Sequence, residues 1–145
     1  QYERIKGVCG TYRVCDISPA ALLEPVFADV AARYLLCDYN DDFGYEFDVV
    51  HFWYVLHHVK KSELGDFFAF IIRHLRRGGV ALFNSPQTDK PEEWYAGDGI
   101  GTTMMTTAEV KDAFALKAVY APLVTEKMLL QETHSSGHVF VVRKT

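Results

Sequence analysis

The sequence predicts an α/β protein with an open, mostly parallel sheet, helices on both faces and an antiparallel hairpin at the C-terminal edge. Short apolar runs rich in β-forming residues alternate with helical patterns along most of the chain. Residues 47–86 are the clearest case, because two apolar strands flank an amphipathic helix, which is the pattern of a parallel crossover. The chain has 145 residues, 49% of them hydrophobic, so we expect one domain spanning 1–145.

The first third of the chain predicts two strands and a broken helix. Residues 12–17 form a short apolar run that we interpret as a strand. Ser18 and Pro19 then favour a helix start, with Ser18 as the cap. Pro25 should kink that helix or split it. A second strand is expected at 34–38.

The middle of the chain predicts the crossover itself. Residues 47–52 are too uniformly apolar to have a wet face, so we expect this strand to be central. Ser62 is the predicted cap of the next helix, and Gly78 is its predicted end. Apolar residues recur at helical spacing between them, at positions 64, 67, 68, 71, 72 and 75. A fourth strand follows at 80–83.

The last third predicts a long loop, a short helix and three strands. Residues 87–103 are polar and contain a proline and several glycines, so we expect one long loop. The spacing of Thr106 and Glu109 predicts a capping box that opens a helix through 114. We expect strands at 118–120, 127–132 and 139–143, with a hairpin turn at 135–137.

Composition narrows the classes of function. The net charge of -4 argues against general binding to nucleic acid or to an anionic membrane. No apolar run reaches the roughly 18 residues that span a bilayer, and no signal-peptide core follows Gln1, so we expect a cytoplasmic protein. The three cysteines form no Cys-x-x-Cys pair, and we expect them to be reduced and buried. The histidines lack ligand spacing, and adjacent His57 and His58 should point apart, so we expect no metal site.

Ligands of open α/β sheets bind beyond the carboxyl ends of the strands. The strand-end residues of this chain are therefore the candidates for a site. They are Asp16, Asp38, the segment 52–54 and the segment 84–86.

Several segments of the chain together resemble the class I methyltransferases that use S-adenosylmethionine, which have a Rossmann-like fold. The segments are 14–19 (second strand), 37–39 (third strand), 47–50 and 56–59 (fourth strand and its sequel), 75–83 (fifth strand) and 139–144 (seventh strand). The resemblance covers about nine tenths of the chain and about two thirds of a typical family core. It implies a methyltransferase, or a piece of one, that acts on a small molecule.

The resemblance also implies roles for particular residues. Asp16, with Ile17 beside it, would hold the ribose hydroxyls of S-adenosylmethionine, and Asp38 would meet the adenine amino group. Tyr39 would line the adenine pocket.

Other residues would lie nearer the methyl group. The end of the fourth strand, Phe52 and Trp53, would also contact the cofactor. His57 or His58 would serve as the general base, because the pKa of histidine suits proton transfer near neutral pH.

One family feature is missing from the expected place. Only fifteen residues precede Asp16, too few for the family's first strand, glycine-rich loop and crossover helix, so the fold is expected to be truncated at its N-terminus. Gly97, Gly99 and Gly101 have the loop's spacing, but they follow the fifth strand and favour a flap on the substrate side.

The missing strand leaves two further hypotheses open. The first is a non-catalytic methyltransferase-like domain with a structural or partner-binding role. The second is a nucleotide-binding module of another doubly wound family. An open sheet edge also predicts a homodimer or a partner chain that covers it.

Overall fold

The computed structural model describes residues 9–86, 92–95, 101–104, 106–115, 120–129 and 136–145. The chain forms two compact units, Gln1–Phe43 and Gly44–Thr145. The predicted α/β fold with a parallel part and an antiparallel C-terminal edge is confirmed. That the whole chain is one domain stays a prediction.

Unit 1 (Gln1–Phe43) contains a two-stranded parallel sheet. Strand β1 (Arg13–Asp16) pairs with β2 (Ala32–Leu35), and Asp16 lies opposite Leu35. Helix α2 (Pro19–Leu22) and the 3-10 helix η1 (Pro25–Phe27) connect them. Ser18 caps α2 by accepting a hydrogen bond from the Ala21 N–H, as predicted, and Pro25 splits the helix in two.

Two predictions for unit 1 were wrong. Strand β2 lies at Ala32–Leu35 and not at 34–38. It ends early because the Asp41 carboxylate accepts hydrogen bonds from the N–H groups of Cys37 and Asp38. These two residues therefore lie in a loop. The cysteines are free thiols but exposed: Cys15 alternates with buried Val14 along β1, and Cys37 lies in the loop.

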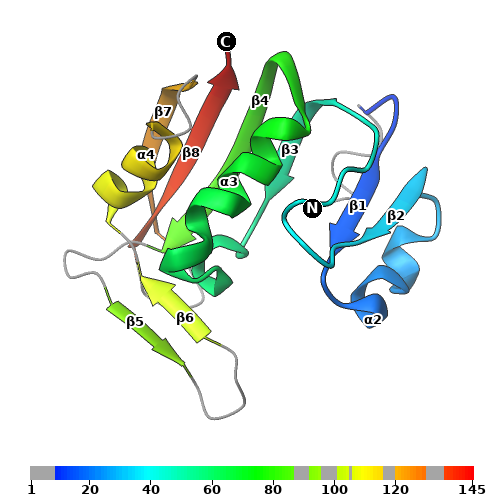
Figure 1. Cartoon of the computed structure of the whole chain (residues 1–145), viewed down its shortest axis with the longest axis horizontal. Helices are drawn as coiled ribbons and strands as arrows, with labels where there is room; N and C mark the ends of the chain where they lie inside the picture. The colour runs from blue at the N-terminus through cyan, green and yellow to red at the C-terminus, as the bar shows by residue number, and fades with distance from the viewer. Residues whose placement is uncertain (1–8, 87–91, 96–100, 105, 116–119, 130–135) are drawn as a thin grey trace. The chain divides into compact units, whose positions relative to one another are not determined.

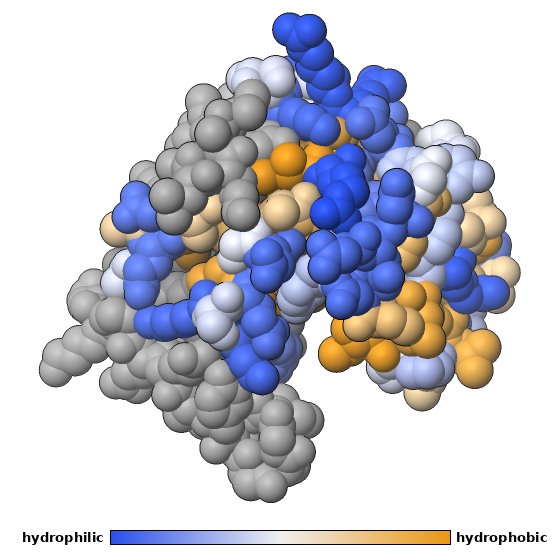
Figure 2. Space-filling model, in the orientation of Figure 1, coloured by the Kyte–Doolittle hydropathy of each residue, from blue (hydrophilic) through white to orange (hydrophobic). Residues whose placement is uncertain are grey.

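The apolar interior of unit 1 is small. Among its described residues, Val14 and Leu22 are the buried apolar side chains. Ile17, Leu23 and Val26, in and beside α2 and η1, are exposed, and Figure 2 shows apolar surface over this part at the lower right. A two-stranded sheet with so small a core is marginal by itself.

Unit 2 (Gly44–Thr145) is built on a four-stranded sheet of order β3-β4-β8-β7 (Figure 1). The strands are β3 (Phe47–Phe52), β4 (Leu75–Pro86), β7 (Tyr120–Leu129) and β8 (Ser136–Lys144). Strands β3 and β4 are parallel, and β8 is antiparallel to both β4 and β7. Ser136 and Gly137, predicted to turn, instead pair within β8.

Strand β3 was predicted to be central, which is wrong for the described part of the chain. It is the first strand of its sheet, and Val49 on it is 55% exposed. The described residues therefore do not bury the apolar side chains of β3 on both sides.

The helix of the crossover is shorter than its pattern suggested. The 3-10 helices η2 (Leu56–His58) and η3 (Lys61–Glu63) precede α3 (Leu64–Arg73), and Ser62 lies within η3 and caps nothing. The apolar face of α3 is buried as predicted and includes Leu64, Phe67, Phe68 and Ile71.

The two glycines after α3 do not end it. Leu75 already pairs with Phe47 in the sheet, so the residues before Val80 form a bulge in β4. Gly78 takes a φ of +80°, and a Cβ on Gly79 would lie 2.8 to 3.2 Å from three backbone oxygens. Glycine is needed at both positions.

The expected long loop contains a hairpin. Strand β5 (Glu92–Tyr95) pairs antiparallel with β6 (Gly101–Met104), and β6 lies beside η2. The rest of the predicted flap, including Gly97 and Gly99, lies outside the described residues. Helix α4 (Thr107–Ala115) follows and contacts α3 (Figure 1). Within the described ranges, no helix is long and apolar enough to cross a bilayer.

Candidate functional site

Unit 1 brings the two predicted acids to the same end of its sheet. Asp16 is the last residue of β1, and its carbonyl accepts a hydrogen bond from the Leu36 N–H at 2.9 Å. Asp38 follows that residue by two positions. Because β1 and β2 are parallel neighbours, both acids lie at the carboxyl end of the pair.

Each acid also supports its own loop. One Asp16 oxygen accepts a hydrogen bond from the Ser18 N–H at 2.8 Å. One Asp38 oxygen accepts from the backbone and side-chain nitrogens of Asn40 at 2.7 and 2.9 Å. These turns fix where the two carboxylates stand.

The Asp41 carboxylate holds the Asp38 loop by two hydrogen bonds. Hydrogen bonds from the N–H groups of Asp38 and Cys37 lower the pKa of Asp41, so its carboxylate stays charged. Tyr39 in this loop is half-buried, and Ile17 next to Asp16 is 75% exposed. That Ile17 and Tyr39 contact a cofactor stays a prediction.

Unit 2 carries the other predicted residues at the end of β3. Phe52 is buried, stacked on Phe83 with ring centroids 4.6 Å apart and edge-on to Phe67 at 5.2 Å. Its side chain belongs to the core, while Trp53 after it is half-buried. That either residue contacts a cofactor stays a prediction.

The chain turns sharply after Trp53. Tyr54 has a φ of +58°, the one positive φ among described non-glycine residues. Its N–H donates a 2.7 Å hydrogen bond to Oδ1 of Asn84, which lies 30 residues later near the end of β4. Asn84 is buried, and in the part of the chain that the structure describes its Nδ2 has no hydrogen-bond partner. Strained backbone and an unpaired buried donor both tend to occur at functional sites.

The two predicted histidines lie just beyond this turn, in η2. Their rings contact each other, with centroids 3.9 Å apart, so the expectation that they point apart was wrong. The His57 ring also lies edge-on to Tyr54 at 6.4 Å.

Burial makes His57 a weak base. Burial first, and the neighbouring His58 second, lower the pKa of His57 to about 4. Its Nδ1 is buried, and no described residue forms a hydrogen bond with it. A neutral imidazole at physiological pH can accept or donate a hydrogen bond at Nδ1, depending on its tautomer.

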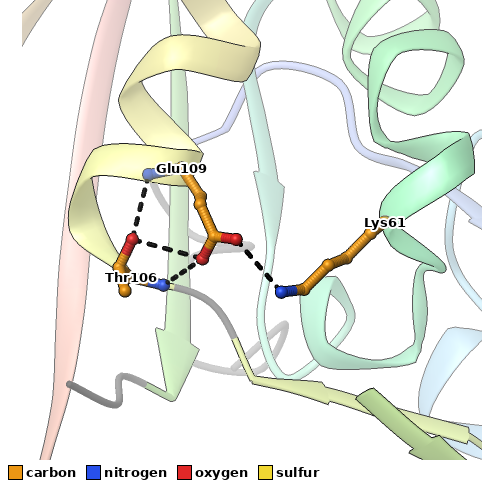
Figure 3. Close-up of polar contacts among 3 residues, drawn as sticks. All are labelled: Lys61, Thr106 and Glu109. Carbon is orange, nitrogen blue, oxygen red and sulfur yellow. Dashed lines mark hydrogen bonds and ion pairs between the residues drawn. The ribbon is translucent and has the colours of Figure 1, made fainter. Parts of the chain in front are cut away.

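A salt bridge and a capping box anchor the segment that follows the histidines. Figure 3 shows the Glu109 carboxylate between Thr106 and Lys61. One oxygen accepts from the Thr106 N–H at 2.8 Å, and the other receives the Lys61 ammonium at 3.0 Å. The Thr106 hydroxyl accepts in turn from the Glu109 N–H, which completes the predicted capping box. Helix α4 is thereby tied to η3.

The part of the chain that the structure describes holds no group of three or more His, Cys, Asp or Glu side chains that could bind a metal ion. The sequence placed Asn84 at a strand end but gave it no role. The sequence signal that could have indicated a role was a single amide side chain within an apolar strand, because a buried polar side chain needs a hydrogen-bond partner.

No protein-family model matches the chain, and no curated protein sequence matches it. Solved structures do match its fold. One is 1,6-didemethyltoxoflavin-N1-methyltransferase of Burkholderia thailandensis, 19% identical, with a TM-score of 0.73, covering 92% of this chain and 60% of that one.

Two further structures agree. The N-methyltransferase NodS of Bradyrhizobium japonicum is 12% identical with a TM-score of 0.71, covering 98% of this chain and 70% of NodS. The amino pentose methyltransferase CalS10 of Micromonospora echinaspora is 17% identical with a TM-score of 0.69, covering 99% and 78%. The chain thus spans 60 to 78% of these proteins' lengths. It has the Rossmann-like fold of the class I S-adenosylmethionine-dependent methyltransferases.

Proposed function

We propose that this chain is a methyltransferase domain, or part of one, that binds S-adenosylmethionine and methylates a small molecule. The observation that carries the proposal is the position of Asp16 and Asp38 at the carboxyl end of neighbouring parallel strands in a fold shared with such enzymes. The NodS structure contains S-adenosylhomocysteine and the CalS10 structure contains S-adenosylmethionine.

The residues of unit 1 fit the nucleoside part of that cofactor. A carboxylate at a strand end is a strong acceptor for ribose hydroxyls, which suits Asp16. Asp38 would accept from the adenine amino group, with Tyr39 and Ile17 supplying apolar contact. The loop hydrogen bonds of both acids hold their oxygens in place before a ligand arrives.

The residues of unit 2 would act on the methyl acceptor. When bound, the cofactor supplies an electrophilic methyl group on a sulfonium. The chain must orient the acceptor's lone pair and accommodate the proton it loses. With a pKa near 4, His57 is a poor base at pH 7 and better suited to orientation, which leaves proton removal to His58 or solvent. Phe52 and Trp53 would help to position the segment that carries His57 and His58.

Calorimetric titration with S-adenosylhomocysteine tests the proposal. Wild-type protein should bind it at micromolar concentration. Asp16→Asn keeps an oxygen for the Ser18 N–H but removes the charge, and it should weaken binding by about tenfold to a hundredfold, as expected for a charged hydrogen bond. Asp112→Asn, an exposed acid on α4, is the matched control and should bind normally.

The opposite results favour the alternative. If millimolar S-adenosylhomocysteine gives no heat, or if the Asp16 and Asp112 variants behave alike, a non-catalytic methyltransferase-like domain is the better description. A nucleotide-binding module would instead bind adenosine diphosphate and not S-adenosylhomocysteine.

We also propose that two copies of the chain associate through β3. This strand is the first in its sheet, and burial of its exposed Val49 against a second copy would be favourable. Light scattering should give twice the monomer mass, and Val49→Lys should restore the monomer. Exposed free thiols suit a reducing compartment, which supports a cytoplasmic location.

A further inference from the structure

The side-chain amide of Asn84 is an unexplained feature of unit 2. The residue is 1% exposed, and its Nδ2 has no hydrogen-bond partner within the described ranges. A buried amide donor left unpaired is costly, because folding strips it of water without replacing the hydrogen bond. Such a group calls for an explanation, which can be stored strain, a catalytic role or a bound partner.

The orientation of this amide is fixed by its neighbour. The Tyr54 N–H is a donor, so the Asn84 atom that receives it at 2.7 Å must be the oxygen. A flipped amide would set two donors against each other. The orphaned Nδ2 therefore lies on the other branch of the same carboxamide, beside the Tyr54 turn.

A second buried polar atom belongs to a residue that contacts Tyr54. The Nδ1 of His57 has no hydrogen-bond partner among the described residues, and the His57 ring packs edge-on against Tyr54. Tyr54 itself is held at a positive φ by the Asn84 hydrogen bond. Two unsatisfied polar atoms and one strained residue thus belong to one small cluster of Asn84, Tyr54 and His57.

We infer that this cluster binds a neutral polar group that both donates and accepts a hydrogen bond, such as a hydroxyl or a heterocyclic amide. Asn84 supplies the donor, and the Nδ1 of His57 supplies the acceptor in the tautomer that carries its proton on Nε2. Leu56 and Val59, on either side of the two histidines, are buried, whereas Tyr54 is half-exposed, so the cluster has an apolar side and a side open to solvent. A charged ligand would lose more hydration there than one amide could replace.

Selective labelling gives a direct test. The chain contains two asparagines, Asn40 and Asn84, so protein labelled with 15N-asparagine shows two side-chain amide pairs. Asn40 lies exposed in the Asp38 loop and serves as the internal control. The probe is 2-pyridone, which carries an adjacent N–H and C=O. N-methyl-2-pyridone is its matched analogue without the donor.

Titration with 2-pyridone should move the Asn84 amide proton downfield and leave Asn40 unchanged. The N-methyl analogue should bind at least about tenfold more weakly, since it lacks one hydrogen bond. His57→Phe keeps an aromatic ring and should remove that difference between the two probes. An unchanged Asn84 signal at saturating probe, or equal affinity for both probes, would overturn the inference, as would a persistent bound-water contact at Asn84 that no probe displaces.

The two proposals fail separately. The pyridone titration is carried out without S-adenosylhomocysteine, so a response at Asn84 stands even if calorimetry detects no cofactor binding. Cofactor binding with a silent Asn84 would overturn this inference and leave the proposed function in place.

Discussion

The Glu109 carboxylate offers the sharpest test of how unit 2 is held together. It closes the capping box of α4 and pairs with Lys61 of η3, each side chain of the ion pair being about one third exposed. Glu109→Ala removes both interactions, whereas Glu109→Gln keeps an oxygen for the Thr106 N–H and removes only the charge. The two variants separate the cap from the ion pair.

The magnitudes follow from the geometry. Loss of the helix cap costs about 1 kcal/mol, and a partly exposed ion pair contributes about 0.5 kcal/mol. The Ala variant should therefore lose about 1.5 kcal/mol, and the Gln variant about 0.5 kcal/mol. With a urea slope of about 2 kcal/mol per molar, the unfolding midpoints should fall by about 0.7 M and 0.2 M.

The effect should depend on pH. Burial raises the pKa of Glu109, but the Thr106 and Lys61 contacts outweigh it and hold the pKa below its ordinary value of 4.5. A lowered folded-state pKa stabilises the protein above 4.5, and that contribution is lost as pH falls through the folded-state pKa. The wild type should therefore exceed Glu109→Gln at pH 7 and match it at low pH.

Urea unfolding followed by circular dichroism at both pH values is the assay. Glu63→Gln is the matched control, because Glu63 pairs with Lys60 at 3.6 Å on a more exposed surface and should matter less. Equal losses for the Ala and Gln variants of Glu109, or a loss for Glu63→Gln as large as that for Glu109→Ala, would refute the reasoning.

Three further predictions use the same assay. Gly79→Ala should cost about 1–3 kcal/mol, because the new methyl meets backbone oxygens at 2.8 to 3.2 Å; Gly10→Ala, with open space around it, should cost little. Lys144→Met should lower the free energy of unfolding by about 2 kcal/mol, because the carbonyls of Ile72 in α3 and Leu75 in β4 lose their donor at 3.0 and 2.5 Å. Arg143→Met is the exposed control. The free energy of unfolding should decrease as the pH is lowered from 6.5 to about 4, because His57 binds a proton in the unfolded state but stays neutral in the folded state. If His57→Gln shows the same dependence of unfolding free energy on pH, this prediction is contradicted.

Local chemistry made several elements predictable. The capping box of Thr106 and Glu109 involves residues three apart, and Pro25 splits its helix through its own ring. The buried face of α3 follows from helical periodicity. Each of these signals acts within one or two turns of chain, so tertiary structure had little to change.

Competition for backbone hydrogen bonds produced the errors. Leu75 left the predicted helix because it pairs with Phe47, and the glycines after it form a bulge. Strand β2 ended early because the Asp41 side chain took the next two N–H groups. In both cases a distant strand or a side chain competed for backbone hydrogen bonds that periodicity alone assigned to a regular element.

By itself, the sequence determined the order of most elements, the α/β class, and the position of Asp16 at the end of the first strand. Tertiary structure decided what surrounds His57 and Asn84. The hydrogen bond from Tyr54 to Asn84 joins residues 30 positions apart, and the Lys61–Glu109 pair joins residues 48 apart. Periodicity and capping report on neighbours along the chain, whereas burial and unpaired polar atoms arise only when distant segments pack together.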